Sequence, residues 1–163
     1  MLVREIMVKS VLTATENTTL AEIAQVMVEQ SIGCVPIVND AGKLTGLITK
    51  SDLTCKDGGI PFLTFRSPHL FGCWLPSDGV EKMYAAAEER LAKEIMTRDV
   101  VTVTEYDSIQ VVLKRMLDTN RKRLPVVREG APVGIVTRQD LLRVINPQWV
   151  GVRVRSARVP GIY

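Results

Sequence analysis

The chain contains the same sequence pattern twice, and this duplication constrains its fold more than any other feature. Residues 4–7 align with residues 93–96, and residues 11–16 align with residues 100–105, both at a shift of 89 positions. One deletion in a turn then aligns residues 46–53 with residues 134–141. Chance does not keep Met, Pro, Gly, Thr and Asp aligned over such a length, so the two copies share one structural unit.

Each copy predicts the order strand, helix, strand, strand, helix. Strands are predicted from short β-branched segments, and the longer helix from apolar residues at helical spacing. Thr19 and Glu22 form a capping-box pattern at the start of this helix, and Asp107 or Ser108 can cap its counterpart. Each second strand contains a proline, which we expect at a strand edge or start. The predicted strands cover residues 11–15, 34–38 and 44–49 in the first copy and 100–104, 124–127 and 133–137 in the second, and the final helices begin near Lys50 and Arg138.

One such unit is too small to bury both faces of its sheet. We therefore expect an α/β (α+β) fold in which two βαββα repeats pack sheet to sheet around a pseudo-twofold axis. This arrangement creates two related clefts between the repeats, where a ligand site is expected. The predicted segments are a first repeat (1–56), an insertion loop and linker helix (57–92), a second repeat (93–146) and a basic C-terminal tail (147–163).

These ordered motifs resemble a tandem pair of CBS domains, also called a Bateman module. The resemblance covers residues 4–54 and 93–146, and it rests on an opening Ile-Met, a Val/Leu-Pro-Val strand and the signature Gly-x-x-Thr-x-x-Asp. The signature occupies residues 46–52 and 134–140. The resemblance implies a stand-alone regulatory module that binds AMP, ADP, ATP or S-adenosylmethionine, uses no catalytic cofactor and signals to an unknown effector protein. It also implies a homodimer.

The resemblance further implies which residues form the two clefts. In each, the signature Asp of one repeat holds the ribose hydroxyls and the Thr lies near ribose or phosphate, while the first two strands of the other repeat frame the adenine. The Asp140 cleft then combines Thr137 and Asp140 with Thr13, Ala14, Thr15, Val35 and Pro36, and the Asp52 cleft combines Thr49 and Asp52 with Thr102, Val103, Thr104, Leu124 and Pro125.

The residue types suit this assignment. An ionised Asp accepts two hydrogen bonds from a cis-diol, and a helix N-terminus favours phosphate. Lys50 and Arg138 stand in the first turns of the two final helices, and Lys122 and Arg123 precede the second Leu-Pro strand, within reach of the Asp52 cleft. Because the equivalent Gly33 and Cys34 carry no charge, we expect more phosphates in the Asp52 cleft and a less charged ligand, or none, in the Asp140 cleft.

Simpler interpretations of these residues stay open. Thr-x-x-Asp at a helix start is also a capping box, and a basic turn such as residues 121–123 is often only solvated. Met27, Met116 and Cys34 suit a hydrophobic core, and His69 stands alone. The aromatic-rich residues 57–79 can pack over the core or bind a partner. Val80, Met83, Tyr84, Ala87 and Leu91 predict a helix that runs into residues 95–96.

Composition and missing motifs narrow the function. The net charge of +3 and the pI of about 8.9 make nucleic acid an improbable partner on charge alone. No apolar run approaches the roughly 20 residues of a membrane span, and three cysteines without metal-ligand spacing fit a reduced, cytoplasmic protein. Since P-loop, zinc-protease and catalytic-triad patterns are missing from the sequence, we expect no enzyme. The alternative is a non-catalytic scaffold or nucleic-acid-associated module that uses the basic tail.

Overall fold

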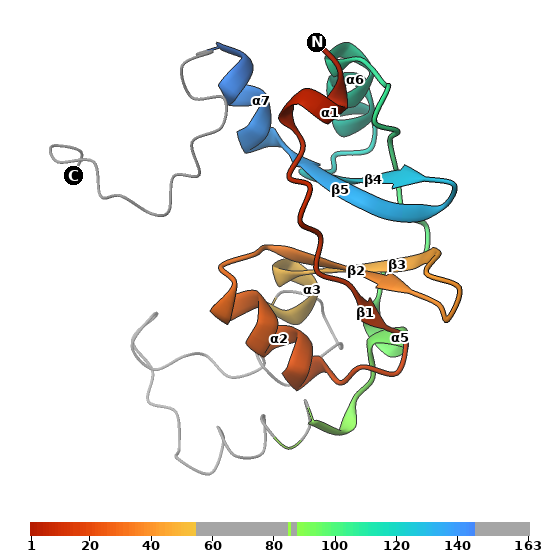
Figure 1. Ribbon diagram of the computed structural model, residues 1–163. Coiled ribbons are helices and arrows are strands. Elements are labelled where there is room, and N and C mark those ends of the chain that lie inside the picture. Colours follow the sequence, from red (N-terminus) through yellow and green to blue (C-terminus); the bar gives the residue numbers. More distant parts are fainter. Residues whose placement is uncertain (55–84, 86–87, 146–163) are drawn as a thin grey trace, which may run out of the picture.

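Short β-branched segments and amphipathic helices form two small sheets that face each other between two layers of helices (Figure 1). The computed structural model describes residues 1–54, 85 and 88–145, so the predicted insertion loop, most of the linker helix and the tail lie outside the described residues. The predicted mixed fold is confirmed. The strands are β1 (Ala14–Thr15), β2 (Cys34–Val38), β3 (Leu44–Thr49), β4 (Arg123–Arg128) and β5 (Ala131–Thr137). The helices are α1 (Val3–Ile6), α2 (Leu20–Glu29), α3 (Lys50–Thr54), α5 (Ala92–Ile95), α6 (Ile109–Asp118) and α7 (Arg138–Ile145).

Helices α2 and α6 each begin at a side-chain cap and bury one apolar face. The Thr19 hydroxyl accepts from Glu22 N (3.3 Å), and the Glu22 carboxylate accepts from Thr19 N (2.8 Å), which confirms the predicted capping box. Ser108 caps α6, whereas the Asp107 carboxylate accepts from the backbone of Thr104 instead. The buried residues of the two helices are Leu20, Ile23 and Met27 in α2 and Ile109, Val112 and Met116 in α6, so the core role of both methionines is confirmed.

The first strand of each repeat is shorter than predicted. Only Ala14–Thr15 forms β1, in parallel with β2, and its counterpart is a single parallel bridge between Val103 and Val126. Residues just before these strands pair with the other repeat, at Val8 with Ile135 and at Thr97 with Leu47. The chain therefore crosses between the two sheets where the sequence predicts regular strand.

Consequently, the repeats exchange their N-terminal segments. Val3 and Ile6 of α1 are 0% and 3% exposed within the hydrophobic cluster of the second repeat. Ala92 and Met96, at 0% and 6% exposed, belong to the cluster of the first repeat. Paired backbone hydrogen bonds of 3.0 Å link Val8 with Ile135, and equal bonds link Thr97 with Leu47. Sequence analysis did not anticipate this exchange.

The predicted continuous helix into residues 95–96 is wrong. Leu91 has an extended backbone (φ −102°, ψ 153°), precedes α5 as its N-cap and bridges to Thr19. A residue with these angles breaks a helix, because helical backbone requires ψ near −40°. The other residues of the predicted helical stripe, from Val80 to Ala87, lie outside the described residues.

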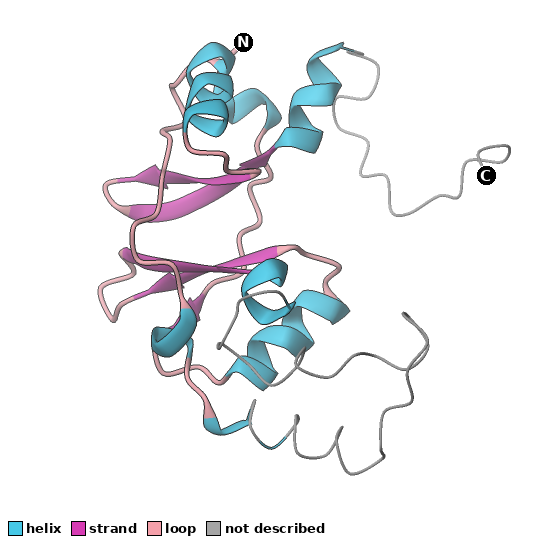
Figure 2. Ribbon diagram, turned by 180° about the vertical axis from the view of Figure 1, so that it is seen from behind, coloured by secondary structure: helices cyan, strands magenta, loops and turns pink. Residues whose placement is uncertain are grey.

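The two hairpins stack with their turns at the same end of the molecule (Figure 2). Leu44 N donates to Gly130 O (2.8 Å), and Lys43 Nζ donates to Glu129 O, so the turns are in direct contact. At the opposite end, β3 leads into α3 and β5 leads into α7 (Figure 1). This agrees with the predicted pseudo-twofold axis, here running along the strands, and it brings both signature motifs to one edge.

Candidate ligand-binding site

At this edge each signature Asp is buried and fixed by its own Thr. Thr49 donates to Asp52 Oδ2 from its backbone N (2.8 Å) and from its hydroxyl (2.7 Å). Thr137 makes the same bonds to Asp140 Oδ2, at 2.9 and 2.7 Å. Asp52 is 7% exposed and Asp140 is 4% exposed. The two carboxylates are thus oriented alike, as the duplication requires.

The capping alternative is part of this geometry. Asp140 N donates to the Thr137 hydroxyl (3.3 Å), which completes a reciprocal capping box at the start of α7. A carboxylate offers about four acceptor positions, so capping and a contact with a diol are chemically compatible. The cap locks each carboxylate in one orientation before any ligand arrives.

Backbone amides at the helix starts are engaged within the protein. Lys50 N donates to Gly33 O (3.2 Å), and Arg138 N donates to Lys122 O (3.0 Å). Thr49 N and Thr137 N are bonded to the signature aspartates. These four backbone amides therefore already have acceptors within the protein, and a phosphate contact with the amides that follow them in each helix stays a prediction.

Arg123 lies across the start of the first repeat's central strand. A Cβ placed on Gly33 would lie 2.6 Å from Arg123 Nη2, so only glycine leaves room for the guanidinium there. Since Gly33 O also accepts from Lys50 N, Arg123 of the second repeat is close to the start of α3. Sequence analysis predicts this cation for the Asp52 cleft, and the contact with Gly33 brings it next to that helix start.

Cys34 lies beside Arg123 but keeps a neutral thiol. Burial raises the pKa of Cys34 to about 11, and the nearby Arg123 charge only partly opposes this shift. The side chain is 5% exposed, so its predicted role as a small core residue is confirmed.

The residues predicted to frame adenine divide into two groups. The side chains of Val35, Val103 and Leu124 are at most 2% exposed and belong to the cores of their own repeats, so only their backbone is available to a ligand. Pro36 and Pro125 are also buried, and alternation along each strand turns them to the opposite face of the sheet. The remaining predicted positions, Thr13, Ala14, Thr15, Thr102 and Thr104, are exposed or half-buried near the ends of the first strands.

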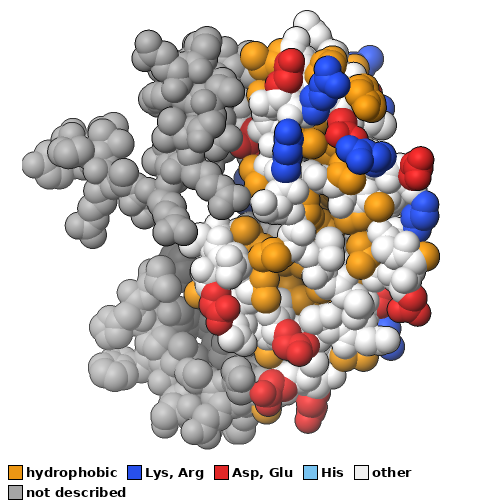
Figure 3. Space-filling view, in the orientation of Figure 1, with side chains coloured by type: hydrophobic (Ala, Val, Ile, Leu, Met, Phe, Trp, Pro, Cys, Tyr) orange, Lys and Arg blue, Asp and Glu red, His pale blue; other side chains and the backbone are white. Residues whose placement is uncertain are grey.

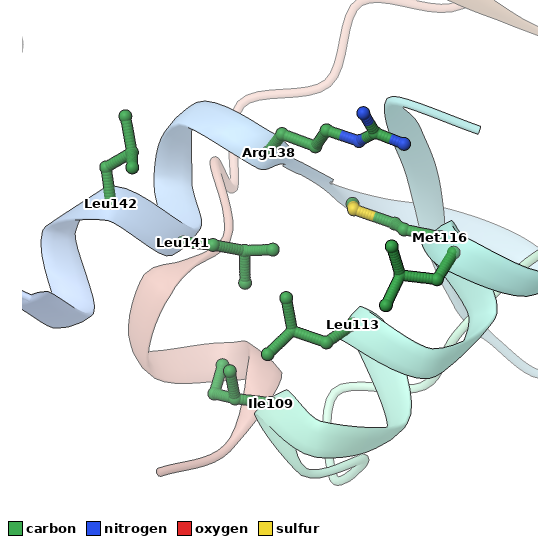
Figure 4. A pocket seen from close by; sticks show the side chains of 7 residues that line it. Ile109, Leu113, Met116, Arg138, Leu141 and Leu142 are labelled. Atoms are coloured by element: carbon green, nitrogen blue, oxygen red, sulfur yellow. The ribbon is translucent and has the colours of Figure 1, made fainter. Parts of the chain in front are cut away.

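Arg138, predicted as a ligand-binding residue in the first turn of the last helix, lines an apolar groove between α6 and α7 (Figure 4). Lys122 and Lys50 are exposed.

Among the described residues, no group of three or more His, Cys, Asp or Glu side chains could hold a metal ion. Within the same residues, every helix is too short or too polar to cross a membrane.

This architecture is that of a known protein family. A model of the CBS domain family matches residues 3–56 and 92–147, and the chain therefore belongs to the CBS domain family as a tandem pair. The structure is similar to the CBS domain of a CBS domain-containing membrane protein from Sphaerobacter thermophilus, with a TM-score of 0.73 and 37% identity over 87% of this chain and 86% of that one.

Two archaeal proteins are also similar. The CBS domain pair of the protein MJ0100, solved in complex with 5′-methylthioadenosine and S-adenosyl-L-methionine, has a TM-score of 0.65 and 28% identity over 91% of this chain and 98% of that one. The uncharacterized protein MJ1225 of Methanocaldococcus jannaschii is 29% identical over 96% of this chain and 47% of its own length. The chain spans about half the length of curated relatives such as this one.

Proposed function

We propose that the chain is a non-catalytic regulatory module that binds an adenosine-containing ligand between its two CBS repeats. The candidate ligands are AMP, ADP, ATP and S-adenosylmethionine. The bound state is read by a partner protein, and the module acts in the cytoplasm as a homodimer. The observation that carries this proposal is the pair of buried, identically oriented carboxylates of Asp52 and Asp140 at one edge of the fold.

The chemistry of the relatives' ligands supports this proposal. Both 5′-methylthioadenosine and S-adenosyl-L-methionine, found with the MJ0100 pair, contain adenosine and therefore a ribose cis-diol. A carboxylate held in place by hydrogen bonds from the capping Thr is an acceptor suited to that diol. It loses little orientational entropy when the ligand binds. A deoxyribose ligand lacks one of the two hydroxyls and should bind less tightly.

The charges of the two clefts support different ligands. Arg123 brings positive charge to the start of α3, and we expect Lys122 to add to it from the sequence, whereas their counterparts Gly33 and Cys34 carry no charge. We therefore assign a phosphorylated nucleotide to the Asp52 cleft and a ligand with less negative charge, such as S-adenosylmethionine, to the Asp140 cleft.

Ligand-induced thermal stabilisation tests the proposal. A ligand at a hundred times its dissociation constant adds about 2.7 kcal/mol to the free energy of unfolding, which raises the melting temperature by several degrees. We expect ATP or AMP to stabilise the wild-type chain, 2′-deoxy analogues to stabilise it less, and Asp52→Asn to abolish the nucleotide response. Asp140→Asn should instead abolish the response to the less charged ligand.

Asn is chosen because its amide oxygen can still accept from Thr49 or Thr137 and preserve the cap. Asp118→Asn, at an exposed position of α6, is the matched control and should leave all responses unchanged. If no adenosine compound stabilises the chain, ligand binding is excluded. RNA binding that weakens steeply with salt would then favour the scaffold alternative.

A further inference from the structure

Tyr106 lies on the surface of the second repeat rather than in a core. It is the only aromatic residue in the part of the chain that the structure describes, and it is 67% exposed. Arg4 lies over its ring in a cation–π contact, with the guanidinium carbon 5.5 Å from the ring centroid. Exposed Tyr and Arg side chains are enriched among the residues that contribute most to protein–protein binding. This pair is therefore a candidate anchor for another molecule.

Three cations gather around this ring and a single buried carboxylate. Arg128 donates from Nε to the carboxylate of Glu105, which is 8% exposed. The hydrogen bond from Arg128 and the charges of that residue, Arg4 and Lys9 lower the pKa of the Glu105 carboxyl. Since one carboxylate neutralises only one of the three cations, the group keeps an excess of positive charge. We call Arg4, Lys9, Tyr106 and Arg128 the Tyr106 cluster.

The first repeat has a different surface at the equivalent place. Lys93 Nζ donates there to the side chain of Asn17 (3.1 Å). The exchanged segments nevertheless make equivalent backbone bonds, since Arg4 N donates to Glu105 O (3.1 Å) and Lys93 N donates to Glu16 O (3.0 Å). An aromatic ring and an additional cation are thus not needed to hold such a segment. The aligned pairs are Arg4 with Lys93, Tyr106 with Asn17 and Arg128 with Asn39.

The Tyr106 cluster lies away from the signature edge but is connected to it. Arg128 ends β4 beside the hairpin turn, whereas Arg123 begins that strand next to the start of α3. Arg4 belongs to α1, which contacts α7. Since α7 begins at the Asp140 cap, two helices in contact join the Asp140 cleft to this surface.

The charges around the cluster distinguish between anionic partners. Glu5, Asp107 and Glu129 each follow a member of the cluster directly in the sequence. Figure 3 shows acidic side chains between the basic ones over the upper, second repeat. A continuous phosphate backbone would meet these carboxylates as well as the cations and be repelled. A peptide with separated carboxylates and an aromatic side chain can pair with the cations and pack against Tyr106.

We propose that the Tyr106 cluster is the docking surface for an acidic segment of the effector protein, in which an aromatic side chain stands among carboxylates. The aromatic side chain packs against Tyr106, and the carboxylates pair with Arg4 and Lys9. This inference rests on the proposed function for the existence of an effector, and it adds the surface and the chemistry by which that effector is recognised.

Binding of defined polyanions to the full chain tests the proposal. The probes are a random copolymer of glutamate and tyrosine, poly-glutamate for charge alone and polyuridylate for nucleic acid. We expect the copolymer to bind about fivefold more tightly than either of the others at equal ionic strength. Tyr106→Asn, which introduces the residue of the first repeat, should remove this advantage, and Lys9→Gln should weaken copolymer binding about threefold. Lys114→Gln removes the same charge from an exposed position of α6 and should leave copolymer binding unchanged.

The other results overturn the proposal. Equal binding of poly-glutamate, or no binding of the copolymer, would show that the ring is not an anchor. Tighter binding of polyuridylate would identify a nucleic-acid surface, and an equal loss in Lys114→Gln would show attraction by charge alone. Because Tyr106 is exposed, Tyr106→Asn should keep the wild-type melting temperature. The thermal response of this variant to adenosine ligands, measured in the same samples, tests the proposed function separately.

Discussion

At the level of single residues, Cys34 lies beside the Arg123 guanidinium, yet burial raises the pKa of its thiol to about 11. Only the thiolate is nucleophilic, so a buried thiol with this pKa is chemically inert. The Arg123 charge therefore does not activate Cys34.

Thiol labelling checks this conclusion. In a Cys55→Ser/Cys73→Ser variant at pH 8, about one thousandth of Cys34 is ionised when the pKa is near 11. We expect no measurable reaction with a disulfide reagent in the native state and complete reaction in urea. The same variant with Leu12→Cys, at a position that is 45% exposed, provides the reactive control. Rapid stoichiometric labelling of native Cys34 would contradict the assignment.

At the level of elements, a methionine of each exchanged segment packs directly on a glycine of the opposite repeat's sheet. Met96 Sδ lies only 2.4 Å from where a Cβ on Gly46 would be, and Met7 Sδ lies 2.5 Å from where a Cβ on Gly134 would be. The two contacts are equivalent under the duplication. They explain why the signature motif begins with glycine: a side chain there would push the crossing segment off the sheet.

Substituting these glycines should destabilise the fold. We expect Gly46→Ala and Gly134→Ala each to cost about 1–3 kcal/mol in the free energy of unfolding, because the added methyl overpacks a filled contact. Chemical denaturation measures this cost. A double-mutant cycle of Gly46→Ala with Met96→Ala should be strongly non-additive, since removing the thioether makes room for the methyl. Additive costs would show that the two residues are not in contact.

The sequence predicted elements well where local patterns decide them. The ranges of β2 and β3 agree with the predicted 34–38 and 44–49, and the cap at Thr19 agrees as well. The first strands were predicted too long because residues before them pair with the other repeat, and no local pattern shows such a partner. Likewise, the orientation of Asp52 followed from its spacing to Thr49, whereas the groove that Arg138 lines depends on packing between α6 and α7, which no local pattern shows.

At the scale of the whole molecule, each hydrophobic core is completed by the other repeat. Val3 and Ile6 fill the second repeat's core, and Ala92 and Met96 fill the first's. The two repeats therefore share their stability, and a ligand that tightens one cleft acts on both cores. We expect a single cooperative unfolding transition for the described part of the chain.

A core substitution in α1 tests this coupling. Ile6→Ala should cost about 2–4 kcal/mol, because Ile6 is 3% exposed and its removal leaves a cavity. Amide hydrogen exchange should show the loss of protection in β4 and β5, far along the chain, as strongly as near the substitution. Leu12→Ala, at an exposed position, should cost less than about 0.5 kcal/mol. Loss confined to the N-terminal residues would contradict the shared core.

The exchange of segments also determines when each repeat can complete its hydrophobic core during synthesis. During synthesis, the first repeat cannot complete its core until residues 92–96 have left the ribosome, whereas the segment that completes the second repeat's core is made before that repeat. A single repeat alone would lack the segment that fills its core, so it would need a second copy to supply that segment. The tandem arrangement supplies both segments within one polypeptide.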